Sequence, residues 1–102
     1  YFSYKRIFLV FGTSCDKDIP GIINELVALS PQVIVTRTAH SRAATISTMA
    51  AEFSKRGIEP EIRETVAEAI SRALYLADRT DIICVIGSLF VAGEALDYFS
   101  GG

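Results

Sequence analysis

Residues 7–21 read IFLVFGTSCDKDIPG, an apolar run followed by a polar loop and the start of a helix. The run at 7–11 carries no polar side chain on either face, which is typical of a strand buried on both sides in a parallel sheet. After the loop, Asp18 suits the N-cap position and Pro20 suits the first helical turn. The stretch therefore predicts the first strand–loop–helix unit of an α/β fold.

Similar units follow along the chain. Strand patterns occupy residues 32–36, 59–63 and 81–87, and the pattern at 59–63 is polar enough for a sheet edge. Helical stripes of apolar residues, at intervals of three and four, begin at residues 19, 46 and 66. Ser41 or a neighbour would cap the second helix and Gly57 would end it, whereas Thr65 and Glu68 form a capping box for the third. A shorter fourth helix is predicted at residues 88–99.

The order β-α-β-α-β-α-β-α predicts a single α/β domain over residues 1–102. We expect a three-layer α/β/α, Rossmann-like architecture with an open, mostly parallel sheet. Cys84 lies inside the last apolar run and is expected to be a buried small hydrophobe.

Composition excludes several classes of protein. The net charge of −2 gives no electrostatic reason to expect nucleic acid, and no apolar run approaches the roughly 20 residues needed to cross a bilayer. Two widely spaced cysteines form neither a disulfide framework nor a zinc motif, so we expect reduced thiols in a cytoplasmic protein. The chain begins with YFSYKR rather than Met, which suggests a piece of a longer chain.

Polar residues gather where the predicted strands end, at residues 12–18, 36–42, 63–65 and 87–88. The carboxyl ends of parallel strands share one edge of the sheet, and ligands of such folds bind there. Gly12 could let a ligand approach or could simply turn the chain, because it belongs to no nucleotide-binding glycine motif. Asp16, Lys17 and Asp18 could cap a helix and face solvent, or could place a cation beside carboxylates to hold a carboxylate or phosphate.

The later loops offer similar alternatives. Arg42 could clamp an anion through its planar guanidinium, whereas His40 lacks the partners of a catalytic triad. Gly87 and Ser88 could form a turn and an N-cap, or could offer a hydroxyl and backbone N–H groups to an anion. Cys15 has no nearby resolving cysteine for redox chemistry. Two loosely spaced carboxylates predict no metal site.

Together the segments LVFGTSCDKDI (9–19), VIVTRTAHSRA (33–43), VAEAISRA (66–73) and DIICVIGSLFVAGE (81–94) resemble one family. The pattern is G-x-x-x-D-K-D, then T-R-x-x-x-x-R-A, then G-S-L-x-x-x-G. It is similar to the C-terminal domain of folylpolyglutamate synthase and dihydrofolate synthase, in the Mur-ligase superfamily. The D-G-A-H-N-P segment and the ATP-binding part of these enzymes are absent from this sequence.

The resemblance implies an ATP-dependent ligase that activates a folate carboxylate as an acyl phosphate, which the amine of L-glutamate then attacks. It implies catalytic roles for Asp16 and Lys17. Substrate-binding roles fall on Thr36, His40, Arg42 and Ser88, and nucleotide contacts on Gly12 and Gly87. ATP and Mg²⁺ would be bound mainly by the missing N-terminal domain and not by this fragment. The fragment alone is not expected to catalyse, and the apolar surface left by that domain could make it self-associate.

Two other interpretations remain open from the sequence. One is a stand-alone binding module with a flavodoxin-like or receiver-like sheet, in which a strand-end aspartate would accept a phosphoryl group or bind an ion. Lys17 adjoins Asp16 instead of following a later strand, which speaks against a receiver. The other is the C-terminal domain of a different Mur-type amide ligase, of the muramyl-peptide or cyanophycin kind.

Overall fold

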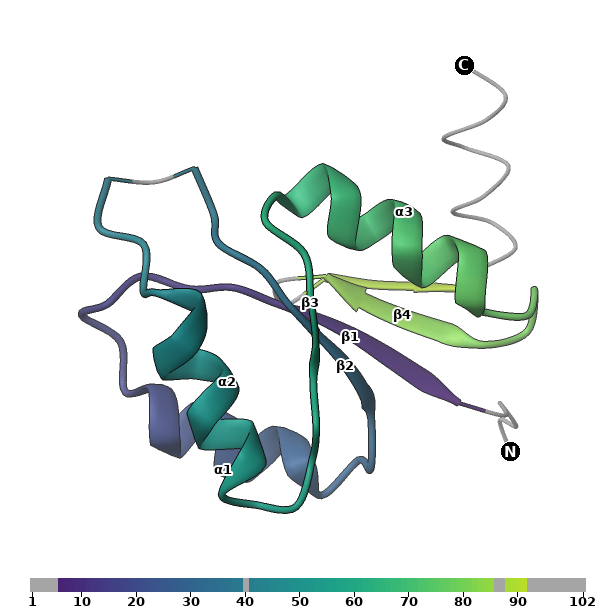
Figure 1. Ribbon diagram of the computed structural model, residues 1–102. Coiled ribbons are helices and arrows are strands. Elements are labelled where there is room, and N and C mark those ends of the chain that lie inside the picture. The colour runs from purple at the N-terminus through teal and green to yellow at the C-terminus, as the bar shows by residue number, and fades with distance from the viewer. Residues whose placement is uncertain (1–5, 40, 86–87, 92–102) are drawn as a thin grey trace.

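The computed structural model describes residues 6–39, 41–85 and 88–91, and Figure 1 shows strands and helices alternating along them until the last two strands, which follow one another directly. In chain order the elements are β1 Ile7–Phe11, α1 Ile19–Val27, β2 Gln32–Val35, α2 Ile46–Ser54, β3 Glu61–Ile62, α3 Val66–Leu76, β4 Ile82–Val85 and β5 Ser88–Val91. Within the described part of the chain, no helix has both the length and the apolar character that crossing a membrane requires.

The strands form one sheet in the order β3-β2-β1-β4-β5. The pairs β1–β2, β1–β4 and β2–β3 are parallel, which confirms the predicted mostly parallel sheet. The polar strand β3 lies at one edge, as its composition predicted, and it is only two residues long. Such a short edge strand offers few unpaired backbone groups to other chains.

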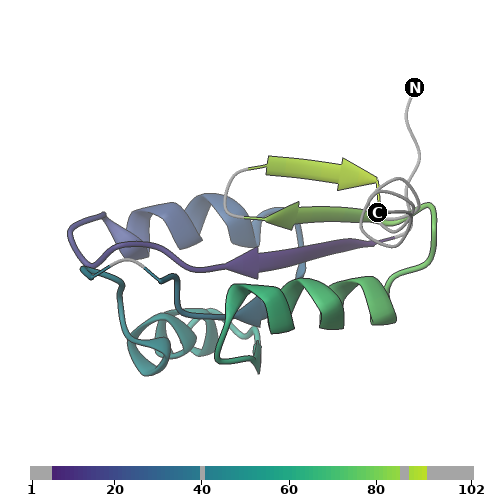
Figure 2. The same cartoon turned by 90° about the horizontal axis from the view of Figure 1, so that it is seen from above.

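The predicted helix at 88–99 is wrong over residues 88–91, which form β5; residues 92–99 lie outside the described part. β5 pairs antiparallel with β4, from Val85↔Ser88 to Ile82↔Val91. Figure 2 shows β1 and β4 pointing one way and β5 the other. Two residues separate Val85 from Ser88, which is the spacing of a tight hairpin, and the sequence LFV favours a strand. The physical reason for the error is therefore hairpin pairing, which overrides the helix start suggested by Gly-Ser.

Helices α1 and α2 cover one face of the sheet. Phe11 of β1 and Phe53 of α2 meet edge to face, with ring centroids 5.4 Å apart. Met49 and Ile23 are fully buried in the same cluster. Cys84, predicted to be buried, is half-buried and packs against this cluster. This face is therefore filled by large side chains from both helices.

Helix α3 covers the opposite face, where Phe8, Val10 and Ile34 point. The helix contributes Ala69 and Ala73, both fully buried. Small side chains at these positions let the helix axis approach the sheet closely. The two faces and the sheet together confirm the predicted three layers.

The helix ends follow the sequence signals. Asp18 caps α1 by accepting a hydrogen bond from the Gly21 N–H at 3.2 Å. The N-cap of α2 is Thr45 and not Ser41, which lies four residues earlier, so the prediction of Ser41 was wrong. The capping box of Thr65 with Glu68 is present at α3, and Gly57 ends the α2 turn with a φ of 82° that suits glycine.

Candidate functional site

The candidate site lies at the carboxyl ends of the central strands. From β1 the chain passes outward to β2 and β3, and then it crosses back to β4 on the other side of β1. The direction of winding thus reverses between β1 and β4, and open α/β sheets bind ligands at such a reversal. The loop after β1, residues 12–18, leaves the sheet at this point.

Within that loop the three charged residues have different surroundings. A turn is closed by the Lys17 N–H, which donates to the Ser14 carbonyl at 3.3 Å. The Ser14 hydroxyl donates to Asp16 Oδ1 at 2.5 Å, and Asp18 is engaged as the cap of α1. Lys17 is exposed, and its ammonium forms no ion pair with the described residues.

The loop after β2 is fastened to the loop after β1. The Cys15 N–H donates to the Arg42 carbonyl at 2.7 Å, and the Ala44 N–H donates to the Thr13 carbonyl at 2.9 Å. These two bonds flank an isolated antiparallel bridge between Ser14 and Ala43. We call this pair of hydrogen bonds the loop clamp. Figure 1 shows the two loops side by side at the left of the molecule. The clamp brings the backbone of the Asp16–Lys17 segment next to that of Arg42.

Gly12 sits at the base of the clamp. A Cβ atom at this position would lie 2.8 Å from the Thr36 carbonyl oxygen and 3.3 Å from Thr38 Cγ2. The close approach that needs glycine here is therefore to the chain after β2. A contact between Gly12 and a nucleotide stays a prediction.

Thr36 ends the β2 pattern and is fully buried. Its N–H donates to the Phe11 carbonyl at 2.9 Å, which extends the β1–β2 pairing by one residue. Its Oγ1 has no hydrogen-bond partner among the described residues. A substrate could reach this hydroxyl only if the surrounding chain moved.

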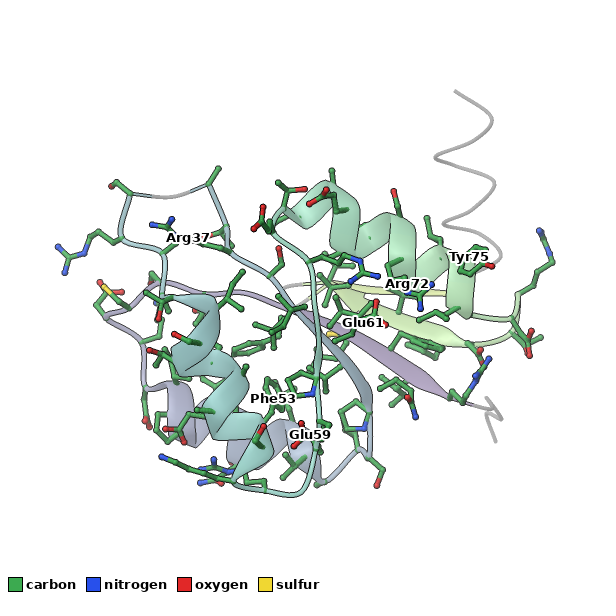
Figure 3. The ribbon with its side chains drawn as sticks, in the orientation of Figure 1. Arg37, Phe53, Glu59, Glu61, Arg72 and Tyr75 are labelled. Carbon is green, nitrogen blue, oxygen red and sulfur yellow. The ribbon has the colours of Figure 1, made fainter. Side chains whose placement is uncertain are left out.

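Arg37, which follows Thr36, is a second exposed cation at this edge. Like Lys17, it forms no ion pair within the described residues. By contrast, five cationic side chains elsewhere on the domain are paired with carboxylates, namely Arg6, Lys55, Arg56, Arg63 and Arg72. Figure 3 shows Arg37 on its loop, well apart from the Glu61 and Arg72 pair. Cations that pair with no carboxylate of the described chain, at the edge where open α/β sheets bind ligands, are suited to an anion.

Comparison with known proteins identifies the family of this sheet and its loops. Residues 1–89 match the family model described as Mur ligase, glutamate ligase domain. The chain belongs to this family.

The relatives of this glutamate ligase domain are much longer proteins. A probable bifunctional folylpolyglutamate synthase/dihydropteroate synthase of Haloferax volcanii is 32% identical over 95 residues, which are 92% of this chain and 11% of the relative. A solved folylpolyglutamate synthase of Mycobacterium tuberculosis, complexed with ADP and AMPPCP, has a TM-score of 0.76 and 26% identity, over 96% of this chain and 24% of its own. The chain thus spans about a tenth of the curated relative.

A further solved structure shares the fold. It is a bifunctional folylpolyglutamate synthase/dihydrofolate synthase with Mn, AMPPNP and L-glutamate bound, at a TM-score of 0.72 and 21% identity, over 93% of this chain and 22% of its own. The family match also decides against the stand-alone receiver-like module considered from the sequence.

The glutamate ligase domain brings some of the predicted site residues together and leaves others unplaced. Asp16, Lys17 and Arg42 lie on the two clamped loops. His40 and Gly87 lie outside the described residues. Ser88 begins β5 opposite Val85. Arg37 was missed as a site residue in the sequence. It directly follows a strand end and belongs to the T-R pattern, and this position could have indicated it.

Shifted pKa values in the glutamate ligase domain occur away from these loops. Hydrogen bonds from Arg56 and then Lys55 hold the pKa of Glu52 below its usual value of 4.5. A hydrogen bond to Glu61 raises the pKa of Arg72. Glu52 is paired within and just after α2, whereas the Arg72 pair joins α3 to β3. Across the described residues, no group of three or more His, Cys, Asp or Glu side chains is placed to hold a metal ion.

Proposed function

We propose that this domain is the C-terminal part of an ATP-dependent carboxylate–amine ligase of the folylpolyglutamate synthase type. The complete enzyme would add L-glutamate to a folate carboxylate through an acyl phosphate. The names of the relatives support this function, as does the small share of their length that the chain spans. Residues 1–102 would then form one domain of a longer cytoplasmic enzyme.

The observation that carries the proposal is a pair of exposed cations at the carboxyl edge of the sheet that form no ion pair with any described residue. Lys17 and Arg37 stand on two loops joined by the clamp, and exposed Arg42 shares the second loop. L-Glutamate brings two carboxylates, and its attack on an acyl phosphate creates an oxyanion. Fixed cations at such a site stabilise both the bound anion and the developing charge.

Each side chain suits a separate task. Lys17 would hold a substrate carboxylate or the phosphate, because its compact ammonium acts as a point charge. Arg37 and Arg42 would bind the other carboxylate of glutamate, since a guanidinium can donate two parallel hydrogen bonds. Asp16, held by the Ser14 hydroxyl, would orient the incoming amine. The roles of Thr36, His40 and Ser88 toward substrate remain part of the proposal.

ATP and Mg²⁺ would be bound mainly by the N-terminal domain of the same enzyme. The described residues at this edge suit an anion better than a metal ion. Lys17, Arg37 and Arg42 are cationic, and no three metal-binding side chains lie close together in the described part of the chain. When bound, ATP supplies the phosphoryl group that activates the folate carboxylate. This domain would close over that site, so the isolated chain is not expected to catalyse.

The test is a substitution at Lys17 in the complete enzyme. Lys17→Ala removes one charge-assisted contact, worth about 1.5–3 kcal/mol, so we expect KM for L-glutamate to rise about tenfold or more. Steady-state kinetics with L-glutamate as the varied substrate measure this change.

Lys55→Ala is the matched control. Lys55 is an exposed lysine at the end of α2, paired with Glu52 at 3.1 Å, and its loss should leave KM for L-glutamate unchanged. Equal kinetics for Lys17→Ala and wild type would refute the role given to Lys17. An intact enzyme that consumes no L-glutamate would refute the proposed function itself.

A further inference from the structure

The loop clamp is an addition to the sheet rather than a part of it. Strands β1 and β2 are parallel, yet the bridge between Ser14 and Ala43 is antiparallel. The pairing forms because the chain after β2 folds back along the loop after β1. The two loops that carry Lys17 and Arg42 are thus hydrogen-bonded to each other through their backbones.

The surroundings of the clamp restrict its movement. On the side of the sheet, the Thr36 carbonyl approaches Gly12 closely, because glycine has no Cβ atom. On the side of the helices, Asp18 is the N-cap of α1. Thr45, which follows the Ala44 donor, is the N-cap of α2. The clamp therefore fixes the loops between the sheet and the starts of two helices.

We propose that the Cys15 backbone N–H is a positioning group for Lys17 and Arg42, the two cations that would bind the substrate. Its hydrogen bond to the Arg42 carbonyl sets the place of the Arg42 loop relative to Lys17, so that both cations meet one amino acid with two carboxylates. Cys15 acts through its N–H and not through its thiol. The inference rests on the proposed function, because it assumes that these cations bind L-glutamate.

Cys15 allows a sharp test of a single backbone bond. It is the second residue of the turn closed by Lys17 N–H and the Ser14 carbonyl, a position that proline favours. Its φ is not positive, and Ser14 before it lies in an extended bridge, which a following proline tolerates. Its side chain is exposed. Cys15→Pro therefore removes the donor and keeps the turn, whereas Cys15→Ala keeps the donor.

In the complete enzyme, we expect Cys15→Pro to raise KM for L-glutamate at least fivefold over Cys15→Ala, with KM for ATP unchanged. Partial unfolding would instead lower the active fraction, and so the apparent kcat, without a selective change in one KM. Equal KM values for L-glutamate in the two variants would overturn the proposal.

A second measurement separates this inference from the proposed function. Amide hydrogen exchange reports the clamp whether or not the enzyme uses L-glutamate. In Cys15→Pro we expect faster exchange of the Ala44 N–H, the other clamp donor, and unchanged exchange along α3. An unchanged Ala44 rate would overturn the coupling of the loops. Faster hydrogen exchange of the Ala44 N–H in an enzyme that does not use L-glutamate would support the coupling of the loops and refute the proposed function.

Discussion

Asp81 is a fully buried carboxylate at the start of β4. Its Oδ2 accepts hydrogen bonds from the Asp78 N–H at 2.7 Å and from the Arg6 guanidinium at 3.0 Å. Arg6 also donates to the Leu76 carbonyl and lies over the Phe8 ring. Because β1 begins at Ile7, this cluster joins the entry of β1 to the entry of β4, at the sheet edge opposite the loop clamp.

Asp81→Ala should destabilise the domain by about 2–3 kcal/mol. The change removes the carboxylate that accepts from the Asp78 N–H and the Arg6 guanidinium. Part of this cost is offset because Arg6 is partly exposed and can form hydrogen bonds with water instead. Urea denaturation measures the loss. The matched control is Asp78→Ala, because Asp78 is exposed and only 3.7 Å from Arg6; it should cost less than about 0.5 kcal/mol. Similar losses for both variants would contradict this account.

Single residues were predictable where local chemistry decides. Asp18 and the Thr65–Glu68 pair were assigned as caps from sequence because capping needs only neighbours along the chain. The clamp was not predictable, since nothing in residues 13–15 indicates that their partners are residues 42–44. The exposure of Arg37, with no ion pair in the part of the chain that the structure describes, likewise depends on tertiary structure.

At the scale of elements, an arginine joins α1 to α2. Arg56, just after α2, donates to Asn24 of α1 at 2.6 Å and to the Glu52 carboxylate at 3.0 Å. Lys55 donates to the same carboxylate at 3.1 Å. These bonds favour the charged form of Glu52, so its pKa in the folded protein lies below the usual 4.5.

The lowered pKa predicts how stability depends on pH. A carboxyl group with a lowered pKa stabilises the fold above its unfolded-state pKa, and this contribution disappears as pH falls through the folded pKa. Glu52→Gln should therefore lower Tm near neutral pH, and its difference from wild type should shrink below about pH 4.5. Thermal unfolding of both proteins across this range measures the difference. A gap that stays constant with pH would contradict the assignment.

The elements themselves were mostly predictable because their periodicity is strong. β1, α1, β2, α2 and α3 appear where apolar spacing placed them. β5 was missed because its identity as a strand depends on pairing with β4, whereas a Gly-Ser pair alone resembles a helix start. Local sequence is a weak guide at a sheet edge, where the partner strand decides the conformation.

At the scale of the whole molecule, the two faces of the sheet are packed differently. Helix α2 buries the large side chains of Met49 and Phe53 on its face of the sheet, whereas α3 buries the small side chains of Ala69 and Ala73 on the opposite face. The layer of α3 therefore tolerates little added volume.

Ala73→Leu should destabilise the domain by about 1–3 kcal/mol, because the larger side chain would push α3 away from the sheet. Ala67→Leu is the control on the same helix, since Ala67 is exposed, and it should change stability by less than about 0.5 kcal/mol. Chemical denaturation of the two variants compares these costs. Equal stability of both would mean that α3 can move outward freely.

The layered architecture could be predicted from the alternation of strands and helices, but the strand order β3-β2-β1-β4-β5 could not. A right-handed crossover fixes the face on which α3 lies once β4 is placed beside β1, but local sequence does not tell on which side of the earlier strands β4 will pair. The location of the candidate site was nonetheless predictable, because every parallel order brings strand ends to one edge.

The chain between Thr36 and Arg42 is attached at both ends to the β1 chain, through Phe11 and Cys15. Its closure is thus already fixed by the rest of the fold, and lengthening such a loop is inexpensive, at about 0.6 kcal/mol for each doubling. Insertions here would change the surface at this edge of the sheet while the sheet itself stays intact. The segment between Thr36 and Arg42 is therefore the place where this fold could accept a longer loop without loss of the sheet.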